Sequence, residues 1–216
     1  MSLVLTAAPA AEPATLAEAK AHLRIDGSAE DALIASLIVT SRLHIEAALG
    51  LALINQSWIW TIDAWPGTVG VSLPVWSVSP LEPISRQAAG VGLALPMRPV
   101  RSVERIMLKA ADGTASVLDP RLYVLDGTSH PARLMPTTML LPNPGQPAQG
   151  IEITLTAGFG PAASDVPAPI RLALLMLVTH WFENREPVEL GARGVGPVRI
   201  PDTVSDLLMP YRSVRL

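Results

Sequence analysis

The sequence predicts an α+β protein in which N-terminal and C-terminal helices pack together around an inserted antiparallel β subdomain. Helical patterns before residue 55 and a strongly apolar stretch over 170–184 predict the helices. Between them, 56–164 shows alternating strand patterns, and its segment 66–99 holds six prolines, which excludes long helices there. The 216 residues suffice for one domain with a large insertion.

The first part, residues 1–55, is predicted to be helical. Thr15 and Glu18 form a capping box, in which a hydroxyl and a carboxylate satisfy the free amides at a helix start. We expect this helix to end at Gly27, and a second to run from Ser28 to a stop at Gly50. Two adjacent apolar stripes follow the second helix: Leu33, Leu37, Thr40 and His44 on one, and Ile34, Ile38, Ile45 and Leu49 on the other.

The second part, residues 56–164, is predicted to be an antiparallel β subdomain with Pro-rich loops. Asp112-Gly113 and Asp126-Gly127 are turn signals, each between two short strand patterns. The predicted strands are Trp58–Ile62, Val103–Leu108, Thr114–Leu118, Leu122–Leu125, Ala132–Met135 and Ile151–Thr156. Trp58 and Trp60 share one face, which favours core packing over a platform for stacked bases.

The third part, residues 165–216, returns to helix and packs with residues 1–55. Pro167 and Pro169 precede a long helix that is apolar nearly all round, as expected of a helix in a core or against partners. A loose Gly-rich stretch, 186–200, leads to a short helix over Asp202–Met209 and an extended C-terminal tail. After residue 190 the chain contains four arginines but only two aspartates. This excess of positive charge fits a tail that docks onto an acidic protein surface, and it fits equally a frayed tail with solvated charges.

The net charge and the proportion of charged residues argue against some classes of function. The formal net charge is −3, which is not typical of a dedicated nucleic-acid binder. Charged residues make up 16% of the chain, against about 25% in an average domain. A low proportion of charged residues is expected if other subunits permanently cover part of the surface. The alternative explanation is a soluble monomer with an Ala-rich composition. The apolar run Leu172–Val178 is too short to span a membrane, so we expect a protein made in the cytoplasm with no membrane partner.

Chemistry-bearing patterns are sparse. The absence of Cys excludes disulfides, thiol catalysis and Cys-based metal sites. His180 and Glu183 share a helix face but lack a third ligand, and the paired carboxylates Asp202 and Asp206 lack catalytic partners. Gly158-Phe159-Gly160 follows a strand, but the alternating strand argues against a dinucleotide fingerprint. The sequence predicts no enzyme, no metal and no cofactor.

Both ends of the chain resemble a known family, the head–tail connector (adaptor) proteins of long-tailed phages and gene transfer agents. At the N-terminal end the resemblance lies in 15–26, TLAEAKAHLRID, and 31–36, DALIAS. At the C-terminal end it lies in 156–160, TAGFG, in 180–186, HWFENRE, and in the segment from Pro201 to Arg212. The middle of the chain, about 64–149, matches only loosely.

The resemblance implies a structural role. Members form a homo-oligomeric ring, of twelve or thirteen subunits, beneath the capsid portal in the neck of a virion or phage-like particle. The ring extends the channel through which DNA passes without specific binding, and it gives the tail-side neck proteins (a stopper or tail terminator) a platform. Helices pack between subunits, which here implies an interface formed by Leu33, Leu37, Ile38, Ile45, Trp181 and Phe182. The C-terminal segment contacts the portal, which implies binding through Arg193, Arg199, Leu207, Leu208, Tyr211, Arg212 and Arg215.

Two other readings stay open on the sequence. Another neck or tail-completion protein, of the tail-terminator or head-closure type, would also form a ring, and its binding partner would separate it from a connector. A small-molecule enzyme, with its site between the helical and β parts, would need a cluster of titratable groups that the sequence does not supply.

Overall fold

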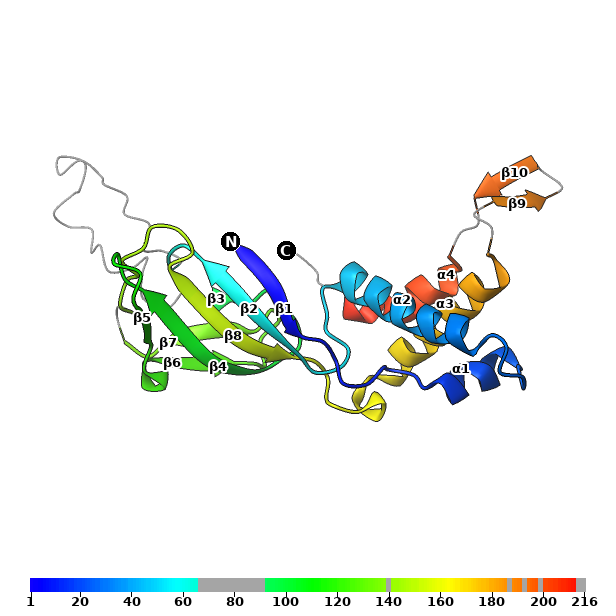
Figure 1. The fold of residues 1–216 in the computed structure, drawn as a ribbon, viewed down its shortest axis with the longest axis horizontal. Helices are drawn as coiled ribbons and strands as arrows, with labels where there is room; N and C mark the ends of the chain where they lie inside the picture. The colour runs from blue at the N-terminus through cyan, green and yellow to red at the C-terminus, as the bar shows by residue number, and fades with distance from the viewer. Residues whose placement is uncertain (66–91, 139–140, 186–187, 192–193, 198–199, 213–216) are drawn as a thin grey trace. The chain divides into compact units, whose positions relative to one another are not determined.

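The protein has two compact units, each built from segments far apart in the sequence. In this computed structural model the described residues are 1–65, 92–138, 141–185, 188–191, 194–197 and 200–212. The β unit comprises Met1–Ala8 and Gln56–Ala157, and the helical unit comprises Pro9–Asn55 and Gly158–Leu216. Helices and antiparallel sheets are both present, which confirms the predicted α+β class (Figure 1).

The helical unit is built from α1 (Leu16–Leu23), α2 (Asp31–Leu49), α3 (Ala168–Glu183) and α4 (Asp202–Leu208). Short 3-10 turns precede α3 (Ala163–Asp165) and follow α4 (Met209–Tyr211). The longest two helices, α2 and α3, pack against each other, and both contact one apolar core. That core contains Ile34, Ile38, Ile45, Leu49, Ile170, Leu174, Leu177, Val204 and Leu208.

Helix ends in this unit follow the predicted signals in part. The capping box is present, with the Glu18 amide donating to Thr15 Oγ1 (3.1 Å) and the Thr15 amide donating to Glu18 Oε2 (2.8 Å). Gly50 ends α2 in the left-handed conformation, as predicted. The end of α1 was predicted at Gly27, but Arg24 takes the left-handed position instead, at φ 57°. A turn at Ser28, whose carbonyl accepts from the Asp31 amide (3.2 Å), delays the start of α2.

The β unit centres on a five-stranded antiparallel sheet. Its order is β1 (Ser2–Ala7), β2 (Gln56–Ile62), β8 (Ile151–Ala157), β4 (Val100–Lys109) and β5 (Ala115–Val117). In register, Trp60 lies opposite Ile153, and Ile153 lies opposite Ile106. All three are buried, so this row of the sheet forms core. Trp58 is half-buried in the same alternation, consistent with core packing for the Trp pair.

The first strand corrects the prediction that residues 1–55 are helical throughout. Ser2–Ala7 forms β1, which pairs with β2 from Ser2 opposite Thr61 to Ala7 opposite Ser57. The partner strand lies more than fifty residues further along the chain, so no local turn signal marks the pairing.

A smaller sheet completes the β unit, formed by β3 (Leu93–Ala94), β7 (Arg133–Pro136) and β6 (Tyr123–Asp126). A 3-10 turn, Pro120–Leu122, precedes β6. The predicted hairpin is confirmed, with Asp126 opposite Arg133. Hydrogen bonds from the Ser129 hydroxyl, Arg133 and the Thr128 hydroxyl hold the pKa of Asp126 well below its usual range. This ionised carboxylate therefore organises the turn between the two strands.

The stretch 186–200, predicted to be loose, contains an antiparallel pair. Strand β9 (Val188–Gly191) pairs with β10 (Gly194–Pro197), and Gly194 lies opposite Gly191. The prediction of a loose stretch is therefore wrong for Val188–Gly191 and Gly194–Pro197.

One helix has an unusual composition for its place in the fold. By length and hydropathy alone, α2 could cross a membrane, since its mean hydropathy reaches 1.5. One side of α2 lies in the core of the helical unit, where Ile34, Ile38, Ile45 and Leu49 are buried. The high hydropathy therefore reflects both this buried side and the side that faces outward.

Candidate functional site

The candidate functional features of this chain are surfaces. Among the residues that the structure describes, no group of three or more His, Asp or Glu side chains is arranged to hold a metal ion. The Gly158-Phe159-Gly160 motif has a structural role, because the Asn55 amide donates to the Gly160 carbonyl (3.0 Å) and the Phe159 amide donates to the Leu53 carbonyl (3.3 Å). At Gly158, φ is +146° and an added Cβ would lie 2.5 Å from the Asn55 nitrogen, so only glycine fits.

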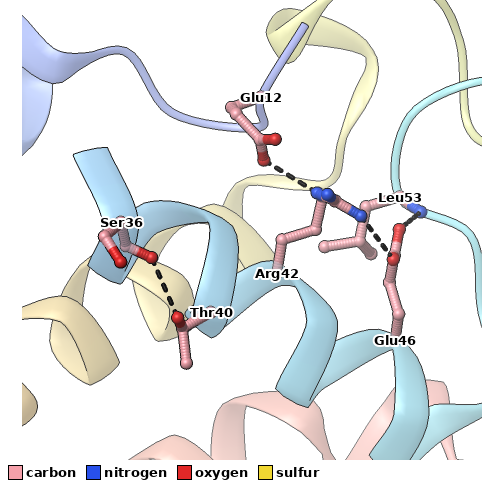
Figure 2. Close-up of polar contacts among 6 residues, drawn as sticks. All are labelled: Glu12, Ser36, Thr40, Arg42, Glu46 and Leu53. Carbon is pink, nitrogen blue, oxygen red and sulfur yellow. Dashed lines mark hydrogen bonds and ion pairs between the residues drawn. The ribbon is translucent and has the colours of Figure 1, made fainter. Parts of the chain in front are cut away.

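The first surface is the outward face of α2. Its exposed residues are Ala32, Ala35, Ser36, Val39, Thr40, Leu43, His44, Ala47 and Ala48. None of them carries a formal charge, and Val39 and Leu43 are 36% and 52% exposed. The Thr40 hydroxyl donates to the Ser36 carbonyl (2.9 Å), so this polar group is satisfied by its own helix (Figure 2). A long exposed helix face without charges is typical of a surface that another protein covers.

The charged residues of α2 lie off this face and pair within the unit. Asp31 accepts from Lys20 Nζ of α1 (2.7 Å). Arg42 donates through Nε to Glu12 Oε2 and through Nη1 to Glu46 Oε2, both at 2.8 Å. Asp31, Arg42 and Glu46 are the residues of α2 that carry a formal charge. Because all three form ion pairs within the unit, the outward face of α2 is left neutral.

Arg42 and its partners form a buried ion-pair network, which Figure 2 shows. The Arg42 side chain is 8% exposed and that of Glu46 is 11% exposed. Glu46 Oε1 also accepts from the Leu53 amide (2.9 Å), so the network joins the segment at Glu12, helix α2 and the loop after it. Desolvation by burial lowers the pKa of Arg42, but hydrogen bonds and charges from Glu12 and Glu46 outweigh it and raise that pKa overall.

A second contact ties α1 to α3. Arg171 donates through Nε to the Pro13 carbonyl (3.1 Å) and forms an ion pair with Glu18. The backbone amide of Thr15 is the largest cause that holds the pKa of Glu18 below its usual range, and the charge of Arg171 acts in the same direction. This contact fixes α1 and the segment before it against the side of α3 that carries Arg171.

The second surface is the outward stripe of α3. Leu172 is 45% exposed, and Leu175, Met176 and Thr179 are half-buried along the same side of the helix. Leu175 and Met176 also pack in part against the core of their own unit. The spacing of three and four residues places them in one row. No charged residue interrupts this row before Glu183 at the helix end.

The predicted subunit-interface residues divide between core and surface. Ile38 and Ile45 are buried in the core of their own unit, so they do not face outward. Leu33 and Leu37 are half-buried at the margin of α2. Trp181 and Phe182 are also half-buried; Trp181 meets His44 edge to face, with ring centroids 5.5 Å apart, and Phe182 lies beneath Arg185.

Sequence reasoning missed Val39 and Leu43, the exposed large apolar side chains of α2. Of the two adjacent stripes that it identified, one lies in the core, and the other reaches the outward face only through Thr40 and His44. A signal was present, because the row from Ala32 through Ser36, Val39 and Leu43 to Ala47 contains no charge.

The predicted portal-binding residues lie at the C-terminal end. Leu208 is 6% exposed and belongs to the core, so it holds α4 in place. Leu207 and Tyr211 are half-buried against that core, and Arg212 is exposed. Arg193, Arg199 and Arg215 lie outside the described residues.

Comparisons with known proteins agree with the resemblance that the sequence shows. Residues 13–74 match a family model described as phage gp6-like head-tail connector protein. No curated protein sequence matches the chain.

Solved structures match over the full length. A chain in the virion of a native gene transfer agent (GTA) particle is 25% identical, with a TM-score of 0.72. Similar chains occur in the neck of an empty GTA particle computed with C6 symmetry (25% identical, TM-score 0.75) and in the neck of a native GTA particle computed with C12 symmetry (25% identical, TM-score 0.71). Each match covers 100% of this chain and 97% of the other. The resemblance to head–tail connector proteins is thus confirmed by sequence and by structure.

Proposed function

We propose that this chain, which resembles head–tail connector proteins in sequence and in structure, is the subunit of a ring in the neck of a phage-like particle, where it joins head to tail. The observation that carries the proposal is the full-length structural match to chains in GTA necks, one of them computed with C12 symmetry. The N-terminal match to the connector family supports the same assignment. The role is structural, and the ring continues the channel for DNA.

The surface chemistry supports a ring subunit. Two outward helical surfaces are uncharged, and charged residues make up only 16% of the chain. A net charge of −3 gives DNA no strongly basic wall to bind during passage.

The C-terminal end is the proposed contact with the portal. Arg212 is exposed directly after the half-buried Tyr211, and Arg215 follows in the sequence. Arginines bind carboxylates with paired hydrogen bonds, which suits an acidic rim on a partner. Leu207, Arg193 and Arg199 remain part of the proposed portal-binding set, whereas Leu208 supports α4 from the core.

Removing residues 212–216 is the test of this docking. The cut keeps Val204, Leu208 and Tyr211, which contact the core, so the helical unit should stay folded. We expect binding to the portal protein of the same particle to weaken at least tenfold, because Arg212 and Arg215 are gone. The measurement is portal binding by biolayer interferometry, with circular dichroism of the shortened chain as the folding control.

Unchanged portal binding by a folded, shortened chain would contradict docking through the C-terminus. The same full-length chain should be tested against the tail-tube protein of the particle. A preference for the tail tube over the portal would favour the alternative role of tail terminator.

A further inference from the structure

We infer that neighbouring subunits meet through two different helix faces: the outward face of α2 on one copy packs against the outward stripe of α3 on the next. The α2 face is defined by Ala32, Ser36, Val39, Leu43 and Ala47, and the α3 stripe by Leu172, Leu175, Met176 and Thr179. The inference rests on the proposed function, because it names the contact that would close the proposed ring.

Ring symmetry demands two unlike patches. A twofold contact uses the same patch on both partners and closes at a dimer, whereas a ring of many copies uses a different patch on each side of every subunit. The similar GTA neck was computed with C12 symmetry, so the contact sought on this chain is of the second kind. A single apolar face that pairs with the same face of another copy would close at a dimer and would not build a ring.

The helical unit supplies two such patches on opposed sides. Helices α2 and α3 pack against each other, and the inward side of each contacts the same core. The outward face of α2 therefore points away from α3, and the outward stripe of α3 points away from α2. A subunit with one apolar face on each side can join a neighbour at both, as a ring requires.

The side chains of the two patches complement each other. Most residues on the α2 face are small, with Val39 and Leu43 lying between two alanines and a serine. The α3 stripe carries the larger side chains of Leu172, Leu175 and Met176. Large side chains on one helix fill the grooves between small ones on another, and the absence of charge on both leaves no ion to be desolvated.

A second copy fits these observations better than a membrane or a different protein. A membrane would bury one face and leave the other without a partner, whereas successive copies bury both. The charged residues of α2 agree with this, because Asp31, Arg42 and Glu46 all form ion pairs within the unit. These charges are therefore not available to attract an oppositely charged partner to α2.

The chain contains no Cys, so engineered cysteines report contacts without background. Four double variants combine Val39→Cys or Leu43→Cys with Leu172→Cys or Met176→Cys. Each is oxidised with copper phenanthroline, alone and with the portal protein of the same particle, and separated on non-reducing gels. Mass photometry of the unmodified chain under the same conditions reports separately whether a ring forms.

The inference predicts a ladder of covalent multimers from at least one double variant, and only monomers from each single variant. Dimers from Leu43→Cys alone would show that α2 pairs with itself and would overturn the inference. A ring that forms with no disulfide from any double variant would overturn it equally, while leaving the proposed function in place. Absence of a ring in both conditions would overturn the proposed function, and the inference with it.

Discussion

Replacing Arg42 with Ala is expected to destabilise the protein by about 3–5 kcal/mol, the cost typical of removing one partner from a buried ion pair. The Arg42 side chain is 8% exposed and donates to both Glu12 and Glu46. Its loss leaves the Glu46 carboxylate, 11% exposed, without its cation. The segment at Glu12 also loses its anchor on α2, so we expect the helical unit to unfold at a much lower denaturant concentration.

Arg185→Ala is the matched control, since it makes the same substitution in the same unit. Arg185 is 55% exposed, and its partner Glu30 is 40% exposed. Exposed pairs contribute about 0–1 kcal/mol, so this variant should lose little. Both are measured by chemical unfolding followed by far-ultraviolet circular dichroism. A loss of only about 0–1 kcal/mol in Arg42→Ala would show that its network stabilises the unit no more than an exposed pair does.

Replacing Leu43 with Glu is expected to abolish ring assembly while leaving the subunit folded. Leu43 is 52% exposed in the subunit, so a carboxylate there is solvated and costs the fold little. In an apolar contact the same carboxylate would be buried without a partner, at a cost of several kcal/mol. Each 1.4 kcal/mol weakens association about tenfold, so assembly at micromolar concentrations should be lost. Mass photometry measures the result.

Ala17→Glu provides the control for the added charge. Ala17 is exposed on the first turn of α1, outside both outward faces, and a carboxylate near a helix N-terminus is tolerated. This variant should assemble like the unmodified protein. Assembly of Leu43→Glu to the same extent would remove the α2 face from the account of the ring.

Local patterns predicted most of the regular structure because they are short-range. The Thr15–Glu18 capping box and Gly50 marked helix ends, and the Asp126-Gly127 turn marked a hairpin that the structure contains. Strand β1 escaped detection because its partner β2 lies far along the chain. The pair β9–β10 escaped because its glycines look like an irregular loop.

The candidate surfaces were predicted less well, for a physical reason. The apolar residues of α2 extend almost around the helix, and periodicity alone does not say which side meets the core. The isoleucines at 38 and 45 lie inside, and the face with Val39 and Leu43 lies outside. The position of α3 decides this, and that position depends on a segment more than a hundred residues away.

The central claim is that this chain forms a ring in the neck of a particle. Its most direct test is the mass of the purified protein, measured by mass photometry alone and with the portal protein of the same particle. The account predicts a species near twelve times the 22.9 kDa mass of one chain, either free or added to the portal. A protein that stays monomeric in both conditions would contradict it.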